Sequence, residues 1–205
     1  MEQVARLGNW MQTASGIQYY PIDPRSDDVN EFDVAQSLSR ICRYLGHCDK
    51  FYTVAEHSVL VSFCVPDYLA LDGLMHDATE AYCCDIPRPL KQALKGYAEI
   101  EHASWMVIAE RFSLLSTLPP EVKYADDSVL MAEREAIITP KRVWNVHAEP
   151  ALVPIFCFGP KTSEALFLQR LHELSSGRFG KTSVRGWLAL AAVKAGIALK
   201  QRSAA

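Results

Sequence analysis

The sequence predicts an all-α protein, a bundle of helices, and three observations lead to this prediction. Apolar residues recur every three or four positions along most of the chain after residue 30, which is the period of an amphipathic helix. Capping residues, glycines and prolines separate these segments where helices begin and end. The alternating pattern of a half-buried strand is almost missing. With 205 residues, of which 49% are hydrophobic, the chain can bury one core of ordinary size.

The first two predicted helices cover residues 33–44 and 53–65. The first follows an Asn or Asp that can cap it, carries apolar residues at helical spacing and stops at a glycine. The second opens with a Thr-x-x-Glu capping box and ends at a proline, because proline lacks the backbone N–H that a helix needs. Together they supply two apolar helix faces for the core.

Helices continue through the rest of the chain, with prolines between them. A helix at 70–84 is ended by Pro87 and Pro89, since proline also restricts the residue before it. Residues 139–160 hold four prolines and are predicted to form a loop. Further helices are predicted at 91–112 (one long or one broken helix), 121–138, 163–174 and 183–201.

We expect three parts in the chain. Residues 1–30 are an irregular leader, in which 17–21 form a short extended piece. Residues 31–175 form the helical domain. Residues 176–205 are a C-terminal helical extension that packs on the domain or on another subunit.

Composition argues against several classes of protein. A formal net charge of −3 provides no overall basic field, so we expect no nucleic-acid partner. No apolar run approaches the roughly 20 residues of a membrane span, and the N-terminal stretch lacks the apolar core of a signal peptide. The six cysteines form no Cys-x-x-Cys pair. We therefore predict reduced thiols in a cytoplasmic protein that binds no membrane.

A cluster of imidazole and acid side chains lies in the predicted helix 70–84. His76 and Glu80 are four residues apart and Asp77 and Glu80 are three apart, so one face can present all three. Asp85 follows at the helix end, where the chain is expected to turn back over the same pocket. Such donors suit a divalent cation and a water. Taken alone, however, a His-Asp pair is more often an ordinary surface pair.

Two candidates on other predicted helices, His57 and Asp126, complete a possible metal site with His76 and Asp77. Helical bundles build metal sites from ligands that converge from facing helices. Mixed imidazole and carboxylate donors suit Mn, Co, Fe, Ni or Zn better than Mg. We therefore predict a divalent metal cofactor, with the identity of the ion left open.

The order of these ligands resembles the HD-domain metal-dependent phosphohydrolase family, whose signature is one His, then His-Asp, then a distant Asp. Here these are His57, His76-Asp77 and Asp126. The stretch 76–91 is similar to the branch that contains bacterial 5′-deoxynucleotidases. In that branch an HDxxE, an Asp five residues further on and a PxPxK tail occur together. The resemblance implies that the helical bundle is an HD domain.

Two more segments extend the resemblance to roughly residues 30–140. The run Val122-Lys-Tyr-Ala-Asp126 resembles the segment with the last ligand, which favours Asp126 over Asp127. The segment 37–59 is similar to a phage-associated group in the same branch, which includes dATP triphosphohydrolases. The terminal parts of the chain lie outside the resemblance.

The resemblance also implies roles for five residues. Glu80 is the implied general base or water-orienting acid, and Asp85 a second proton-transfer group or a ligand of a second cation. For both acids a solvated helix face is the alternative. Arg43 is implied as a phosphate clamp, since its planar guanidinium can bind two oxygens at once. Lys91 and Lys123 are further phosphate candidates, with an ordinary surface role as the alternative.

The remaining candidates concern the nucleoside. Tyr44 stands where the deoxynucleotidases have a Trp that packs on the sugar, which keeps a stacking surface and leaves open how a 2′-hydroxyl would be excluded. Leu45, Ile86 and Pro89 are predicted to form an apolar slot for the base, with core packing as the alternative. His47 is a further candidate for substrate contact.

The implied activity is hydrolysis of a 2′-deoxyadenosine nucleotide, with metal-bound water attacking the α-phosphorus of dATP to give deoxyadenosine and triphosphate. One alternative is a 5′-deoxynucleotidase that removes the phosphate of dNMPs, which breaks the same kind of bond. An alternative of another class is a non-catalytic nucleotide-binding module. Members of this family assemble into dimers or larger rings, so the resemblance implies a homo-oligomer, such as a dimer or a hexamer. It would act in the cytoplasm, the host's if a phage encodes it.

Overall fold

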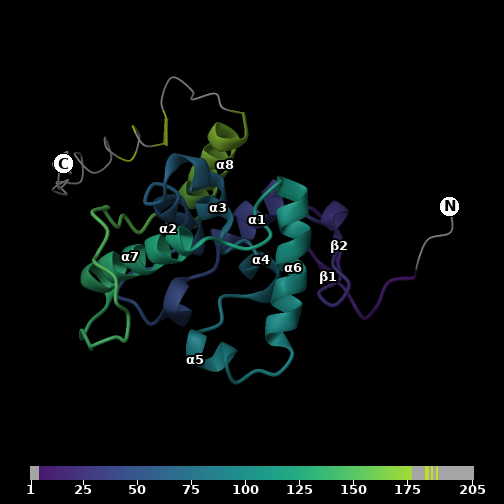
Figure 1. Cartoon of the computed structure of the whole chain (residues 1–205), viewed down its shortest axis with the longest axis horizontal. Coiled ribbons are helices and arrows are strands. Elements are labelled where there is room, and N and C mark those ends of the chain that lie inside the picture. The colour runs from purple at the N-terminus through teal and green to yellow at the C-terminus, as the bar shows by residue number, and fades with distance from the viewer. Residues whose placement is uncertain (1–4, 177–182, 185, 187, 189–205) are drawn as a thin grey trace.

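Helices dominate the computed structural model of the chain, which describes residues 5–176, 183, 184, 186 and 188 (Figure 1). The all-α prediction is confirmed, since the described elements are helical apart from one small hairpin of β1 (Met11–Gln12) and β2 (Gln18–Tyr19). The α-helices are α1 (Glu31–Leu38), α2 (Val54–Val61), α3 (Ala70–Met75), α4 (Glu80–Cys83), α5 (Arg88–Lys91), α6 (Tyr97–Phe112), α7 (Pro120–Ile137) and α8 (Pro160–Ser176). Three 3₁₀ helices are η1 (Ser26–Asp28), η2 (Arg43–Gly46) and η3 (Asp67–Leu69).

Helix α2 lies at the centre of the core, and all eight of its residues are buried. It packs against α3, α7 and α8, and α8 also packs against α1. The side chain of Thr53 caps the helix by accepting a bond from the Glu56 amide at 3.0 Å, as the capping box predicts. The Glu56 carboxylate does not return that bond. It accepts the backbone N–H groups of Phe156, Cys157 and Phe158 at 2.7–3.0 Å, which anchors the loop after α7.

The predicted helix 33–44 is shorter than expected. The Asn30 side chain caps α1 by accepting a bond from the Asp33 amide at 2.9 Å, but the helix ends at Leu38. Beyond it, Arg43 donates its amide to the Tyr52 carbonyl at 2.9 Å, and the chain enters η2. Pairing with the segment before α2 therefore replaces the last helical turn that the apolar spacing predicts.

The predicted helix 70–84 is divided into two. Residues 76–79 form a turn in which amides bond three residues back, for example Ala78 to Met75 at 2.8 Å and Glu80 to Asp77 at 3.0 Å. A run of such bonds tightens the backbone relative to an α-helix. The expected single helical face from His76 to Glu80 is therefore wrong, and His76 and Asp77 lie on a turn.

The helix predicted at 53–65 is shorter than expected, because α2 ends at Val61 and the next amides bond three residues back, as Cys64 does to Val61 at 2.8 Å. The remaining predicted elements agree with the structure to within a few residues where it describes them. The segment 91–112 is the broken alternative, since α5 and α6 are separated and Gly96 precedes α6 with a φ of +79°. Helix α7 and the loop before α8 occur within one or two residues of the prediction. The leader contains the expected extended piece, and Tyr19 in it is fully buried and stacks on Tyr82 with ring centroids 4.0 Å apart. Most of the predicted helix 183–201 lies outside the described residues.

Two further expectations concern the whole chain. All six cysteines are free thiols, as predicted. Within the ranges that the structure describes, no helix is both long and apolar enough to cross a membrane.

Leu74 provides a test of the core around α3, because its side chain is fully buried. We expect Leu74→Ala to lower the free energy of unfolding by about 2–5 kcal/mol, since it removes apolar contacts and leaves a cavity. Urea denaturation followed by circular dichroism measures the change. Leu115→Ala is the matched control, because that leucine is 46% exposed. Equal losses in the two variants would show that α3 is not part of the core.

Candidate metal centre

Three side chains from separate parts of the fold bring ligand atoms together. His57 on α2, His76 on the turn after α3 and Asp126 on α7 each place one donor atom within 4.8 Å of the others, so the group could hold a metal ion. His57 Nε2 lies 3.4 Å from His76 Nε2 and 3.2 Å from Asp126 Oδ1. Donor atoms that share one ion at about 2.1 Å lie roughly 3 Å apart, so these spacings fit one ion. The predicted convergence of these three side chains is confirmed, but His76 comes from a turn and not from a helix.

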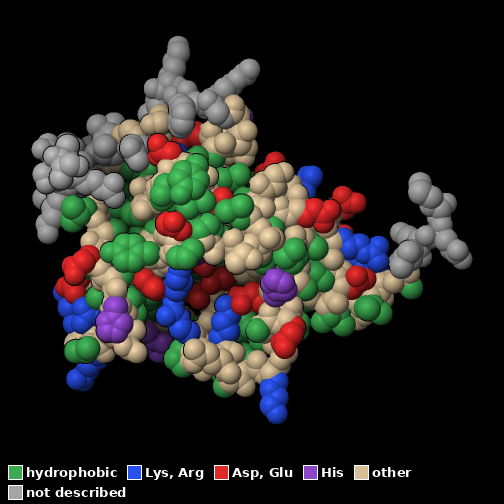
Figure 2. Space-filling view, viewed as in Figure 1, with side chains coloured by type: hydrophobic (Ala, Val, Ile, Leu, Met, Phe, Trp, Pro, Cys, Tyr) green, Lys and Arg blue, Asp and Glu red, His purple; other side chains and the backbone are tan. Residues whose placement is uncertain are grey.

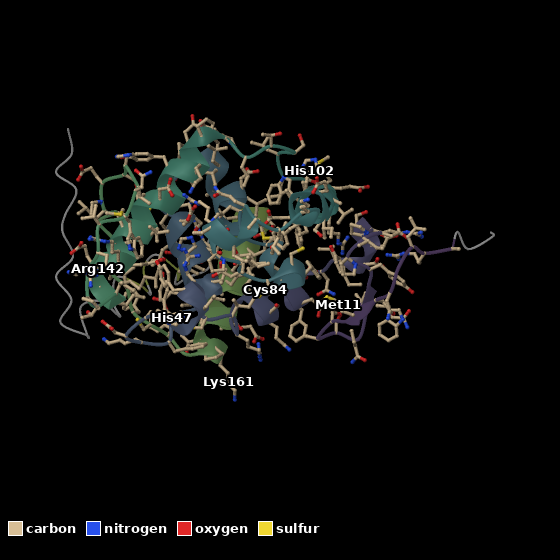
Figure 3. The ribbon with its side chains drawn as sticks, turned by 90° about the horizontal axis from the view of Figure 1, so that it is seen from below. Met11, His47, Cys84, His102, Arg142 and Lys161 are labelled. Atoms are coloured by element: carbon tan, nitrogen blue, oxygen red, sulfur yellow. The ribbon has the colours of Figure 1, made fainter. Side chains whose placement is uncertain are left out.

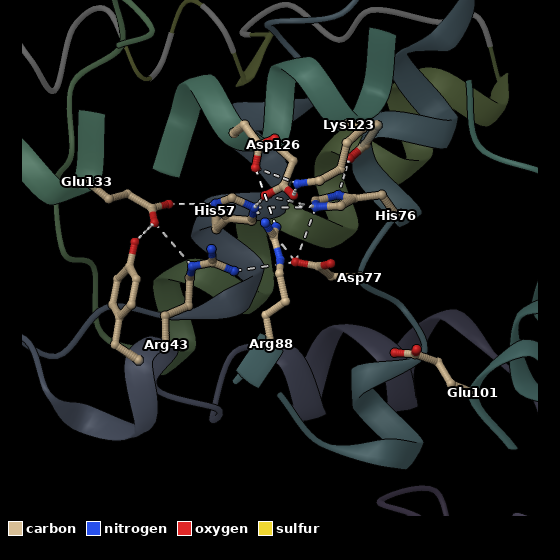
Figure 4. Close-up of polar contacts among 12 residues, drawn as sticks. Arg43, His57, His76, Asp77, Arg88, Glu101, Lys123, Asp126 and Glu133 are labelled. Carbon is tan, nitrogen blue, oxygen red and sulfur yellow. Dashed lines mark hydrogen bonds and ion pairs between the residues drawn. The ribbon is translucent and has the colours of Figure 1, made fainter. Parts of the chain in front are cut away.

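Asp77, the fourth predicted ligand, lies beside this group. Its Oδ2 atom is 3.2 Å from His76 Nε2 and 3.7 Å from His57 Nε2. The same oxygen faces Arg43 Nη1 at 3.4 Å. Asp77 therefore stands between the three ligand atoms and the predicted phosphate clamp (Figure 4).

Both histidines have their second ring nitrogen engaged. Nδ1 of His57 lies 2.5 Å from the carboxylate of Glu133, and Nδ1 of His76 lies 2.9 Å from the Gly73 carbonyl. A metal-binding histidine commonly donates its other N–H in this way, which fixes the ring and leaves the opposite nitrogen for the ion. The Nε2 atoms of both rings point into the group, as a metal centre requires (Figure 4).

Glu133 extends this arrangement to the predicted substrate residues. Its carboxylate is fully buried and accepts bonds from Arg43 Nε at 3.2 Å and from the hydroxyl of Tyr44. Sequence reasoning missed this residue. It follows Asp126 by seven positions on α7, so the two lie on one helix face, and this spacing was the available signal.

The acids of the site fall into two electrostatic groups. Burial opposes ionisation of Asp77, but the neighbouring His76 imidazole lowers the pKa of this carboxyl to about 2. Burial opposes ionisation of Asp126 too, while its bond with His57 lowers its pKa well below the ordinary value. In contrast, burial raises the pKa of Glu80 well above its ordinary value, and the charges of Asp77 and Asp85 add to this. Burial likewise raises the pKa of Asp85. Carboxyls with separated pKa values are typical of acid–base sites.

A cavity of about 490 Å³ opens beside the ligands, between α7 and α5. Figure 2 shows it as a hollow with acidic side chains at the bottom and basic side chains at its edge. Of the predicted residues it is lined by Arg43, Tyr44, Leu45, Asp77, Glu80, Asp85, Ile86, Pro89, Lys91 and Asp126. Glu80 Oε2 is buried there without a hydrogen-bond partner among the described residues.

The ligand histidines His57 and His76 stand behind this lining, and two further predicted residues, Lys123 and His47, also lie outside it. Lys123 on α7 pairs with Asp126 at 2.7 Å and with Asp127 at 2.5 Å, so it contacts a ligand and not the cavity. His47 is exposed and also lies outside the lining. Figure 3 shows His47 at a separate place on the surface from His102.

Sequence reasoning missed other residues of the cavity wall. Arg88 lies between the two prolines before Lys91, and its guanidinium lies 3.5 Å from Asp127. Trp144 comes from the loop after α7, and its ring centroid is 6.0 Å from that of Tyr44. Nothing in the local sequence indicates that this tryptophan reaches the site, because it does so only when the loop folds back beside Arg134 of α7.

The wall at η2 has an unusual backbone. Tyr44 and Leu45 both adopt left-handed conformations, with φ of 58° and 53°. Residues other than glycine rarely adopt this region, and those that do are concentrated at functional sites, where the surrounding structure holds them. Here the Tyr44 hydroxyl bonds to Glu133, which is one such restraint.

A second cavity of about 430 Å³ lies on the other side of the His76–Asp77 turn. Glu101, His102 and Trp105 of α6 line it together with both residues of the turn. Glu101 also pairs with Lys91, which lines the first cavity. The His-Asp turn is therefore accessible to groups on two sides.

No known protein-family profile matches the chain. The chain is similar to the uncharacterized protein YfdR of Escherichia coli K12, with 39% identity over 174 residues that cover 83% of this chain and 98% of YfdR. It is also similar to an uncharacterized protein of Rhodobacter capsulatus, with 32% identity over 126 residues, which are 57% of this chain and 64% of that protein. The name of neither protein specifies an activity.

The charge state of His57 leads to a test of the metal centre. Burial and Arg43 oppose protonation of this imidazole, but Glu133 and Asp126 outweigh them and raise its pKa to about 9. Protonation of His57 therefore adds to the free energy of unfolding of the metal-free protein. This contribution is complete at pH values below about 6.5, the pKa of histidine in the unfolded chain, and it is lost as the pH rises through about 9.

We expect Co²⁺ binding near pH 7.5 to displace this proton, with a release of about one proton per ion that disappears above about pH 9.5. Calorimetry in buffers of different ionisation enthalpy measures the release. Asp127→Asn is the control and should keep it, since Asp127 is not among the ligands. Ion binding near pH 7.5 with no proton release would contradict this assignment.

Proposed function

The chain belongs to the family of YfdR of Escherichia coli, and we propose that it is a metal-dependent hydrolase of 2′-deoxyadenosine nucleotides. The preferred reaction converts dATP to deoxyadenosine and triphosphate. The observation that carries this proposal is the convergence of His57, His76 and Asp126 beside a cavity lined by basic side chains and by Glu80, whose Oε2 atom is buried and has no hydrogen-bond partner in the described part of the chain. The resemblance of the ligand order to HD-domain phosphohydrolases, and of segment 37–59 to the phage dATP triphosphohydrolase DatZ, supports it.

The donors fit a divalent ion, because two imidazole nitrogens and one carboxylate oxygen converge with Asp77 beside them. This set favours Mn, Co, Fe, Ni or Zn and suits Mg less well. When bound, such an ion supplies Lewis acidity, which lowers the pKa of a water and neutralises charge on a phosphate.

Glu80 is proposed to take the proton of the attacking water. Burial and the charges of Asp77 and Asp85 raise its pKa, so this carboxylate accepts a proton more readily than an exposed glutamate. A general base works best with a pKa near the operating pH. Asp85, whose pKa is also raised, would pass a proton on to the leaving group or to solvent.

The basic residues of the cavity are proposed to hold the phosphate chain. Arg43 is buried between Glu133 and Asp77 and can present its remaining N–H groups to oxygens. Lys91 and Arg88 lie further out in the same wall. Lys123 would join them only by leaving its pairs with Asp126 and Asp127, which makes it the weakest phosphate candidate.

The apolar part of the same wall is proposed to contact the nucleoside. Tyr44 would pack on the sugar, with Trp144 beside it, and Leu45, Ile86 and Pro89 would contact the base. The resemblance alone supports adenine as the base. It also supports a homo-oligomer, a dimer or a hexamer, in the cytoplasm.

The cavity beyond the His-Asp turn favours dATP over dAMP. A 5′-deoxynucleotidase needs room on one side of the reacting phosphorus, whereas cleavage at the α-phosphorus of dATP needs room on two sides. Cavities of about 490 and 430 Å³ flank the turn and meet this need. A non-catalytic nucleotide-binding module would have no use for Glu80 in this wall, where its Oε2 atom is buried and finds no hydrogen-bond partner among the residues that the structure describes.

Product analysis tests the proposal directly. Incubated with Co²⁺ or Mn²⁺, the purified protein should convert dATP to deoxyadenosine and triphosphate, as read by chromatography and ³¹P NMR. Excess chelator should abolish the reaction, because the ligands alone lack Lewis acidity. Orthophosphate from dNMPs with dNTPs untouched would establish the deoxynucleotidase instead. Activity that survives the chelator would refute metal dependence.

Glu80→Gln tests the proton acceptor. We expect the hydrolysis rate to fall by about 10²–10⁴-fold with Co²⁺ affinity unchanged, because the amide cannot take a proton and Glu80 is not among the ligands. Rates at saturating dATP and Co²⁺ titrations measure the two effects. Glu110→Gln, an exposed position on α6, is the matched control. A Glu80→Gln variant with the rate of the control would remove Glu80 from the mechanism.

A further inference from the structure

We propose that Glu133 is a positioning residue that makes ion binding and phosphate binding at this site depend on one buried carboxylate. The inference rests on the proposed function for its choice of phosphate as the ligand. It adds a residue to which neither the sequence pattern nor the resemblance assigns a role.

The contacts of Glu133 join the two halves of the site. One oxygen faces Nδ1 of the ligand His57 at 2.5 Å, and the other accepts Nε of the clamp Arg43 at 3.2 Å (Figure 4). Asp77 makes a parallel connection, because its Oδ2 lies 3.4 Å from Arg43 Nη1 and 3.7 Å from His57 Nε2. His57, Glu133, Arg43 and Asp77 thus form a closed ring, in which Glu133 and His57 have no exposed surface.

Because the Glu133 carboxylate is buried, it restrains the positions of both Arg43 and His57. Its side chain has no exposed surface, so water cannot replace a partner that is lost or displaced. A movement of the Arg43 guanidinium therefore has to be matched by the carboxylate, and through it by the His57 ring. The orientation of a metal ligand and that of a phosphate clamp are tied to each other.

The third partner extends the restraint to the cavity wall. The Tyr44 hydroxyl donates to Glu133, and Tyr44 and Leu45 are the two residues in left-handed conformations. These residues directly follow Arg43, so the bond that holds the strained backbone also fixes where the clamp begins. Loss of the Tyr44 hydroxyl should therefore loosen Arg43 even though that hydroxyl is directed at Glu133.

A simpler role would be local. Glu133 could only neutralise Arg43, in which case its loss would affect phosphate and leave the ion site unchanged. It could only orient His57, in which case its loss would affect the ion alone. The proposal requires both effects from one substitution.

The test compares Glu133→Gln with Glu135→Gln, which removes the same charge from an exposed position on the same helix. Co²⁺ affinity and the visible absorption of bound Co²⁺ report on His57. Tripolyphosphate affinity at saturating Co²⁺ reports on Arg43. For Glu133→Gln we expect the Co²⁺ dissociation constant to rise by about 10–100-fold with an altered spectrum, and the tripolyphosphate constant by about tenfold. If either dissociation constant of Glu133→Gln equals that of the Glu135→Gln control, the proposal is overturned.

Tyr44→Phe covers the case in which Glu133→Gln does not fold, because it leaves the buried charges in place. We expect weaker tripolyphosphate binding by several-fold at saturating Co²⁺. Tripolyphosphate has no sugar, so the loss cannot arise from the packing of Tyr44 on a nucleoside. An unchanged constant would overturn the proposal.

These binding measurements need no turnover, so the two proposals fail separately. A wild-type protein that hydrolyses no nucleotide, with both affinities lost in Glu133→Gln, would refute the proposed function and keep the role of Glu133. If the wild-type protein hydrolyses dATP and Glu133→Gln binds Co²⁺ and tripolyphosphate as tightly as the Glu135→Gln control does, the proposed function is kept and the role of Glu133 is refuted.

Discussion

Helix α2 is buried along its whole length, and this burial constrains the rest of the structure. Two of its residues, Glu56 and His57, are ionisable and must be satisfied inside the protein, since unpaired buried ionisable groups are costly. Glu56 takes three backbone amides of the loop before α8, which holds that loop against the core. His57 takes Glu133 on one side and faces the ligand group on the other. The surrounding elements thus pack against a largely apolar helix whose Glu56 and His57 side chains point in fixed directions.

The buried charges of the site occur in pairs of opposite sign, because a single unpaired charge would be too costly to bury. Arg43 lies between Glu133 and Asp77, and both carboxylates also face His57. In the metal-free state His57 is protonated near neutral pH, because its pKa is raised, and its positive charge adds to that of Arg43. A bound metal ion would replace this proton. This explains how several acids and one buried arginine coexist within a small volume. Glu80 differs from Asp77 and Asp126, whose pKa values are lowered, because burial and the charges of Asp77 and Asp85 outweigh Arg43 and Lys91 and raise its pKa.

Two strained or broken segments of the fold lie at this site. The turn at 76–79 interrupts a helix where His76 and Asp77 are needed, and η2 places Tyr44 and Leu45 in left-handed conformations at the cavity wall. Local departures from ideal helices are therefore found where side chains must point at a common centre. The regular helices α6, α7 and α8 provide the support.

Much of the fold and part of the site follow from the sequence by itself. Apolar spacing, caps and prolines determine where most helices lie, because these signals act over a few residues, and the pattern His57, His76-Asp77, Asp126 names the ligand candidates. Tertiary structure decided the rest. Helix α1 stops early because residues 41–43 pair with the segment before α2, and Trp144 reaches the cavity from a proline-rich loop. Glu133 can be recognised as part of the site only once α7 packs on α2 and brings its carboxylate to His57 and Arg43. Contacts between residues about 76 and 90 positions apart leave no local pattern, so only the packed structure reveals them.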